Sequence, residues 1–174
     1  MKGTRAAGSK GLTEKPLLVT RHPVREEARS LRVLLAEDNL VNQKLASRLL
    51  EKHGHNVVTA ANGRQALERI EAENFDIVLM DVQMPEIDGF EATATVRKME
   101  EATGAHLPIV AMTAHAMQGD NQRCMAAGMD GYLAKPLDVK KLLEVVQAVL
   151  DRSRLDSSAT FLESVRNAGG IDRD

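Results

Sequence analysis

The chain has 174 residues, of which 43% are hydrophobic and 28% are charged, and its formal net charge is −2. This composition is typical of one globular domain with additional segments, and the lack of an excess of basic residues argues against direct binding of nucleic acid. The single cysteine, Cys124, excludes an intrachain disulfide and a cysteine-rich zinc site, so we expect a reducing, cytoplasmic location.

Residues 1–30 form a basic segment, with seven lysines or arginines against three glutamates. Glycine, serine and proline are interspersed, so we interpret it as a linker or tail. Its apolar runs are too short for a signal peptide or a membrane span, and we expect no membrane segment in this chain. One run, PLLVT at 16–20, has the length of a short strand from an upstream unit, which indicates a fragment of a longer protein.

From residue 31 onward, short apolar runs alternate with segments of helical period. The runs have the length and residue types of strands, and they lie at 31–36, 56–60, 76–81, 107–113 and 131–134. The helical segments lie at 40–54, 62–74, 89–104, 116–129 and 138–152. Gly54 and Gly128 stand where helices end, and Asn62 and Asp138 stand where helices begin.

Strands such as IVLM at 77–80 are apolar without interruption, which indicates a sheet covered on both faces. Such sheets are parallel, with right-handed helical crossovers. The predicted fold class is therefore α/β, a doubly wound five-stranded parallel sheet with five helices. In this class the functional site lies beyond the carboxyl ends of the strands.

Polar groups stand at four of these strand ends. Glu37 and Asp38 follow the first strand, Asp81 ends the third, Thr113 ends the fourth and Lys135 follows the fifth. Carboxylates bind a hard cation such as Mg²⁺, which also accepts phosphate oxygens. Asp81, beside such a metal and an ammonium group, can attack a phosphoryl group and form an aspartyl phosphate. These residue types therefore predict Mg²⁺-dependent phosphoryl transfer to Asp81.

Each of these residues also has an ordinary structural interpretation. An isolated pair such as Glu37 and Asp38 is common at a helix N-terminus, and Asp81 alone fits a turn before the loop MPEIDG. Thr113 fits a strand end, and Tyr132 fits a half-buried packing position. The functional interpretation is favoured because matching groups stand at the ends of independent strands.

Four motifs, LLAEDNLVNQK, DIVLMDVQMPEIDGFEA, PIVAMTAHA and GYLAKPL, occur in this order between residues 31 and 151. They resemble the receiver domain of two-component response regulators, and most closely the receivers of hybrid histidine kinases. The resemblance implies a flavodoxin-like sheet of order 2-1-3-4-5 over residues 31–152, between tails at 1–30 and 153–174. It also implies that the domain catalyses its own phosphorylation and slow dephosphorylation.

The resemblance assigns a role to each motif residue. Asp81 is the expected phosphoacceptor. Glu37, Asp38 and Asp81 are expected to hold Mg²⁺ together with the backbone carbonyl of Gln83. Lys135 is expected to bind the phosphoryl group.

Thr113 and Tyr132 match the switch pair of the family. Phosphorylation adds about two negative charges, Thr113 moves toward the new oxygen, and the Tyr132 ring turns inward. The surface formed by the fourth helix, the fifth strand and the fifth helix is then expected to change. Gln83 and His115 occupy the positions that tune the lifetime of the phosphoryl group, and the peptide bond before Pro136 is expected to be cis.

Three alternatives belong to other functional classes. A phosphatase of the haloacid dehalogenase kind also uses an aspartyl nucleophile, but it needs a second aspartate two residues later, where Gln83 stands. A P-loop enzyme is excluded because the motif G-x-x-x-x-G-K-[ST] is missing from the sequence. A receiver that binds its partner without phosphorylation usually lacks an acidic or lysine position, and here all of them are present.

The partners implied by the resemblance are a histidine kinase or a histidine phosphotransfer domain. The stretch LVTRHPVREEARSLRVLLAEDN resembles the linker between a kinase ATPase domain and its receiver. We therefore favour a receiver from a hybrid sensor kinase, whose parent is compatible with a membrane anchor, over a free-standing single-domain regulator. Residues 153–174 are interpreted as the start of a linker toward a phosphotransfer domain.

Overall fold

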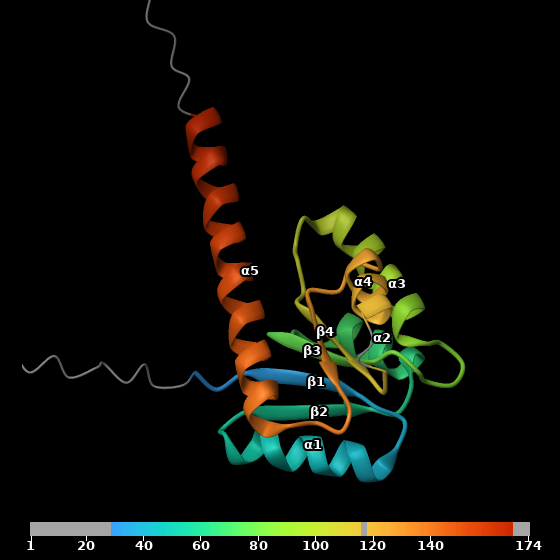
Figure 1. The fold of residues 1–174 in the computed structure, drawn as a ribbon. Coiled ribbons are helices and arrows are strands. Elements are labelled where there is room, and N and C mark those ends of the chain that lie inside the picture. Colours follow the sequence, from blue (N-terminus) through green and yellow to red (C-terminus); the bar gives the residue numbers. More distant parts are fainter. Residues whose placement is uncertain (1–28, 116–117, 169–174) are drawn as a thin grey trace, which may run out of the picture.

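The computed structural model describes residues 29–115 and 118–168, in which strands and helices alternate (Figure 1). The strands are β1 (Arg32–Ala36), β2 (Asn56–Ala60), β3 (Ile77–Asp81), β4 (Ile109–Thr113) and β5 (Gly131–Ala134). The helices are α1 (Leu40–Lys52), α2 (Gly63–Ala72), α3 (Gly89–Thr103), α4 (Gln118–Ala126) and α5 (Val139–Ala168). The elements expected from the sequence are thus present, and their ends differ by a few residues except at the end of α5.

The strands form one parallel sheet in the order β2-β1-β3-β4-β5, which confirms the predicted doubly wound fold. The chain moves outward from β1 to β2 and then crosses back to β3, so the strand order reverses between β1 and β3. The register pairs Ala36 with Met80 and Asp81 with Met112, which brings the carboxyl ends of β1, β3 and β4 to one edge. Ligands bind at this edge in sheets of this kind.

Helices cover both faces of the sheet, as the apolar strands predict (Figure 1). On one face, α1 and α5 pack over alternate strand residues such as Leu35 and Leu79. On the other face, α2, α3 and α4 pack over the intervening residues, such as Val78 and Met80. Every residue of β3 and β4 is buried. Burial on both sides explains why these strands lack an alternation of apolar and polar residues.

The predicted helix ends have the contacts that their residue types suggest. The side chain of Asn62 accepts a hydrogen bond from the Gln65 amide at 2.8 Å, and Asp138 accepts one from the amide three residues later at 2.9 Å. Gly54 and Gly128 have φ angles of 85° and 92°, a left-handed conformation that glycine adopts without a steric penalty.

The fifth helix is longer than the sequence analysis predicted. We expected a helix end at residue 152 followed by a linker, but α5 runs to Ala168. Glycine and proline are missing from residues 153–168, and the hydroxyls of Ser157 and Ser158 donate to helix carbonyls four residues earlier. Leu150 still packs against the core, whereas Leu155, further along α5, is 70% exposed. Packing of α5 against the sheet therefore ends near Leu150.

Some expectations at the ends of the chain lie outside the described residues. The expected linker at 1–30 lies outside the described residues except for its last two positions, and its PLLVT run at 16–20 lies wholly outside them. The domain boundary near residue 152 stays a prediction. Among the described residues, no helix combines the length and the apolar character needed to cross a membrane.

Candidate functional site

Three carboxylates meet at the carboxyl ends of β1 and β3. Glu37 and Asp81 are only 2% and 3% exposed, whereas Asp38 is exposed to solvent. One oxygen from each of the three lies within 4.8 Å of the others. Hard oxygen ligands at this spacing suit Mg²⁺, which binds through few carboxylates and keeps several waters. The fold therefore brings together the three side chains predicted as metal ligands.

Hydrogen bonds from the start of α1 allow Glu37 to be buried. Its carboxylate accepts hydrogen bonds from the Asn39 amide at 3.1 Å and from the Asn42 side chain at 3.4 Å. The Asn39 side chain also caps α1 by accepting a hydrogen bond from the Val41 amide at 2.9 Å. The sequence analysis missed both asparagines, although an asparagine directly before a helical segment is a recognisable cap.

Lys135 supplies the cation of this site. We call Glu37, Asp38, Asp81 and Lys135 together the acidic cleft. Its ammonium nitrogen lies 2.5 Å from Asp81 Oδ2 and 2.7 Å from Glu37 Oε2, so it bridges the two buried carboxylates. The Lys135 amide donates to the Thr113 carbonyl at 2.7 Å, and the peptide bond between Lys135 and Pro136 is cis. The two carboxylates repel each other, and the ammonium between them offsets that repulsion.

Burial and ion pairing shift the pKa of Asp81 in opposite directions, and the same holds for Lys135. Desolvation raises the pKa of Asp81 above its usual value, and hydrogen bonds from Lys135 and the Gln83 amide offset this only in part. Desolvation lowers the pKa of Lys135, but its hydrogen bonds and charge interactions with Asp81 and Glu37 outweigh burial, so that pKa is raised. The ammonium is therefore held charged, whereas burial makes ionisation of Asp81 costly.

The remaining predicted residues lie around the cleft. The Thr113 hydroxyl is buried, donates to the His115 carbonyl and accepts from the His115 amide, both at 3.2 Å. These bonds engage Thr113 with the loop after β4 rather than with Asp81. Tyr132 on β5 is exposed. The Gln83 amide donates to Asp81 Oδ1 at 3.0 Å, a contact that the sequence analysis did not predict.

A cavity of about 450 Å³ lies between α4 and the residues that follow Asp81 at the end of β3. Gln83, Thr113 and His115 line it together with Asp88 and Arg123. The two residues predicted to tune the lifetime of a phosphoryl group therefore share one cavity with the predicted switch threonine.

Gly89, the first residue of α3, lies against the backbone of Asp81. A Cβ atom at position 89 would lie 2.3 Å from the Asp81 carbonyl oxygen and 2.9 Å from Val82 Cα. We expect Gly89→Ala to lower the free energy of unfolding by about 2–3 kcal/mol, because a clash with backbone atoms cannot be relieved by rotating a side chain. Urea unfolding of the full chain measures this change.

Gly119 offers a matched control for this prediction. A Cβ atom there meets nothing within 4 Å, and position 119 lies in α4. Gly119→Ala should therefore be neutral or stabilise the chain by up to about 1 kcal/mol, since alanine favours a helix over glycine. Equal unfolding midpoints for the two variants would contradict the close approach at Gly89.

Comparison with known proteins identifies relatives of the chain. The family model of the response regulator receiver domain matches residues 33–147. Hybrid signal transduction histidine kinase I of Dictyostelium discoideum is 46% identical over 120 residues, which cover 66% of this chain and 7% of that protein. Sensor histidine kinase GacS of Pseudomonas protegens is 46% identical over 120 residues, which cover 68% of this chain and 13% of that protein. The chain thus spans a small part of the length of these relatives.

Two solved structures extend the comparison. The receiver domain of a sensor histidine kinase from Pseudomonas aeruginosa, with a magnesium ion coordinated in its active site cleft, has a TM-score of 0.64 and 38% identity, and the match covers 71% of this chain and 99% of that one. The receiver domain of Ssk1 from Saccharomyces cerevisiae, in complex with the histidine phosphotransfer protein Ypd1, has a TM-score of 0.63 and 31% identity, with 65% and 83% covered. The family match includes every residue of the acidic cleft, and the chain belongs to the response regulator receiver domain family.

Proposed function

We propose that this receiver domain accepts a phosphoryl group from a phosphohistidine onto Asp81, with Mg²⁺, as a step in a phosphorelay. The observation that carries the proposal is the position of the Lys135 ammonium between the buried carboxylates of Asp81 and Glu37, beside the exposed Asp38. This arrangement offers a nucleophile, a cation and a metal-binding set of oxygens within one small cleft.

In the proposed reaction, a carboxylate oxygen of Asp81 attacks phosphorus while the P–N bond to the donor imidazole breaks. The bonding electrons leave with the imidazole nitrogen, and the product on Asp81 is an acyl phosphate. Lys135 pairs with the charge on the transferred oxygens. Mg²⁺ held by Glu37, Asp38, Asp81 and the Gln83 carbonyl would supply further charge neutralisation. Hydrolysis by water later restores the carboxylate and releases inorganic phosphate.

The proposed output is a change of surface. The Thr113 hydroxyl leaves its contacts with His115 and binds a phosphoryl oxygen, and the exposed Tyr132 ring turns inward into the space that opens. The surface of α4, β5 and α5 then favours its active conformation. Gln83 and His115 line the cavity beside Asp81, where water can approach the acyl phosphate, and we propose that they set its lifetime.

An exposed apolar patch at the start of α1 supports a protein donor. Leu40, Val41 and Leu45 are all exposed, and Leu40 stands two residues after Asp38. Exposed large apolar side chains that lie together mark docking surfaces. We propose that a histidine phosphotransfer domain or a histidine kinase binds here. The complex of the related receiver with Ypd1 supports this class of partner.

We further propose that the chain is the receiver part of a hybrid sensor histidine kinase. The relatives at 46% identity are histidine kinases in which the matched segment occupies 7% and 13% of the protein. In that context the receiver would work on the cytoplasmic side, where the ATP-dependent kinase reaction of the parent protein takes place.

The proposal is tested by the intact mass of the full chain after incubation with phosphoramidate or acetyl phosphate and Mg²⁺. The expected result is a gain of one phosphoryl group, which is lost on treatment with hydroxylamine because acyl phosphates react with it. Chelation of the metal before incubation should prevent the gain, because among the described residues Lys135 is then the one cation beside Glu37 and Asp81. A mass gain of equal size with and without Mg²⁺ would contradict the proposed metal role.

The docking patch is tested by placing a charge in it. Val41→Asp should slow transfer from a phosphorylated phosphotransfer domain by about tenfold, because it puts a carboxylate into an apolar contact. Val41 is 74% exposed, so the fold should tolerate the change. Leu155→Asp is the matched control, since Leu155 is 70% exposed on a distant part of α5. Both variants should react normally with phosphoramidate, and equal transfer rates from the protein donor would refute the patch.

A further inference from the structure

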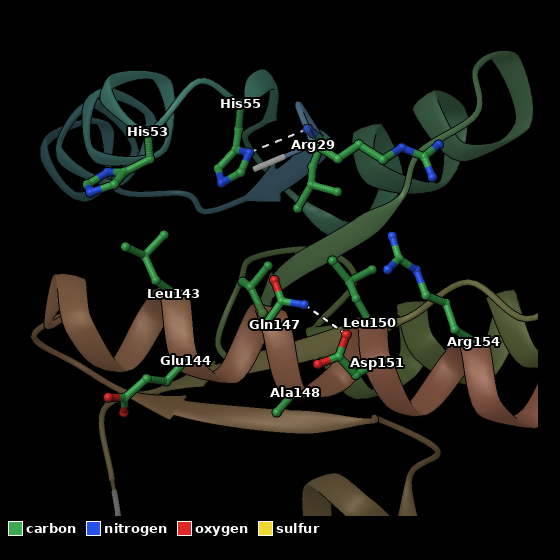
Figure 2. Close-up of a pocket in the computed structure, with 12 residues that line it drawn as sticks. Arg29, His53, His55, Leu143, Glu144, Gln147, Ala148, Leu150, Asp151 and Arg154 are labelled. Carbon is green, nitrogen blue, oxygen red and sulfur yellow. Dashed lines mark hydrogen bonds between the residues drawn. The ribbon is translucent and has the colours of Figure 1, made fainter. Parts of the chain in front are cut away.

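A groove of about 970 Å³ separates one face of α5 from the end of α1 and the start of β1 (Figure 2). Arg29, His53 and His55 lie along one side of it, and α5 residues between 143 and 154 form the other side. The groove lies at the amino ends of the strands, away from the acidic cleft. The proposed phosphoryl transfer does not use it.

Beside charged residues such as Arg29, Glu144 and Arg154, the groove has apolar side chains that the domain itself covers only in part. Leu31 and Val146 are buried in its floor, whereas Leu143 and Leu150 keep part of their surface exposed. Covering such leucines with another apolar segment is favourable by about 25 cal/mol per Å² of buried surface. The groove therefore favours an apolar occupant over a small polar ligand.

The length of the groove fits a short extended segment. The α5 residues that line it span 143–154, which corresponds to about 17 Å along a helix. An extended segment of five residues has the same length, about 17 Å. A groove of this length takes about three turns of a helix or one strand-like run of five residues, so the residues that are available decide between them.

The chain itself supplies such a run close to the groove. Residues 1–28 precede Arg29, which lines the groove, and they contain one run of consecutive large apolar residues, PLLVT at 16–20. The eight residues 21–28 between this run and Arg29 can reach about 27 Å when extended. This length is enough for the chain to turn back and lay the run along α5.

Charged side chains flank the run and also line the groove. Lys15 and Arg21 stand directly on either side of PLLVT. Glu144 and Asp151 line the groove, and so do Arg29 and Arg154 (Figure 2). The positive and negative charges of the groove therefore balance, and it is the apolar contact and the short connection to Arg29 that favour this occupant.

We infer that in this chain residues 16–20, which the sequence alone suggested as a strand of an upstream unit, instead bind in this groove as an extended segment between α1 and α5. The contact would anchor the segment that precedes the receiver domain to α5, one of the elements of the proposed output surface. The inference concerns docking within the chain and does not depend on phosphorylation of Asp81, so either proposal can fail without the other.

The test uses the full chain with a nitroxide spin label on Thr20→Cys. Cys124 does not compete for the label, because it is buried and desolvation raises the pKa of its thiol. The expected result is a loss of amide NMR signals from Leu143 to Leu150, with no loss along α3 on the other face of the sheet. Adding Leu18→Asp should restore these signals.

Leu12→Asp in the same labelled chain is the matched control, because Leu12 lies in the same tail but outside the run. It should leave the signal loss unchanged. Undiminished amide signals from 143–150 in the labelled chain, or equal effects of the two substitutions, would overturn the inference. Signal loss in a mixture of isotope-labelled chain and separately spin-labelled chain would show that the tail of a second copy fills the groove, which would also overturn it.

Discussion

Asp81→Asn is expected to abolish the mass gain from phosphoramidate and Mg²⁺ completely. The carboxylate of Asp81 is the only nucleophile that the proposed reaction uses, and an amide oxygen does not form the acyl phosphate. Glu37 is paired with Lys135 at 2.7 Å and is a proposed metal ligand, so we do not expect it to replace Asp81 as the acceptor. Intact-mass measurement on both proteins checks the prediction.

The same substitution should not destabilise the chain. Desolvation raises the folded-state pKa of Asp81 above its unfolded value, so the folded state holds the proton more tightly than the unfolded state. As the pH rises through that folded-state pKa, ionised Asp81 therefore costs stability. A neutral asparagine removes this cost, and we expect the free energy of unfolding at neutral pH to rise by up to about 1 kcal/mol.

Asp88→Asn is the matched control for Asp81→Asn. Asp88 lines the cavity beside the cleft and caps α3 through the Glu91 amide at 2.8 Å. Asparagine caps helices as well as aspartate does, so the fold should be kept. This control should still be phosphorylated. Phosphorylation of Asp81→Asn at the wild-type level would disprove the assignment of the phosphoacceptor.

Much of the fold could be predicted because it depends on local patterns. The strand β3 reads as apolar along its whole length because both of its faces are covered, and this alone indicates a parallel sheet. Glu37, Asp81 and Lys135 could then be placed together, because the carboxyl ends of parallel strands share one edge. The conclusion needed only the strand boundaries, which the sequence defines to within a few residues.

Contacts between distant residues could not be predicted in this way. The Arg97 guanidinium donates to the Gly128 carbonyl at 2.8 Å and pairs with Asp130 at 2.8 Å, which ties α3 to the turn before β5. Arg97 stands in a helix with ordinary helical spacing, and nothing local indicates these partners. The approach of Gly89 to the Asp81 backbone is hidden for the same reason, because it depends on how α3 packs against the end of β3.

The length of α5 shows a different limit of sequence patterns. Residues 153–174 are interpreted from the sequence as the start of a linker, and serine and aspartate at 153–158 are residues that favour turns over helices. In the structure, the hydroxyls of Ser157 and Ser158 bond within the helix, and the chain stays helical beyond the sheet. The predicted helix end at residue 152 was therefore wrong, although packing against the sheet does end near Leu150.

Lys135→Met should have the opposite effect on stability from Asp81→Asn. The pKa of Lys135 is raised by Asp81 and Glu37 despite its desolvation, so its charge stabilises the fold at neutral pH, and this contribution is lost only as the pH rises through the folded-state pKa. Removing the ammonium leaves two carboxylates that are 2% and 3% exposed without a cation. We expect a loss of about 3 kcal/mol in urea unfolding without Mg²⁺.

Added Mg²⁺ should restore part of that stability, and the gain should be larger in Lys135→Met than in the wild type, because the ion then replaces the cation that Lys135 supplied to the buried carboxylates. Phosphorylation by phosphoramidate should slow by about 100-fold, since the charge on the transferred oxygens loses a partner.

Lys140→Met is the control: Lys140 is 86% exposed and 3.9 Å from Glu144, whereas Lys135 is 19% exposed. The control should change the free energy of unfolding by less than about 0.5 kcal/mol. Equal free energies of unfolding for Lys135→Met and Lys140→Met without Mg²⁺ would show that the Lys135 ammonium does not stabilise the buried carboxylates of Glu37 and Asp81.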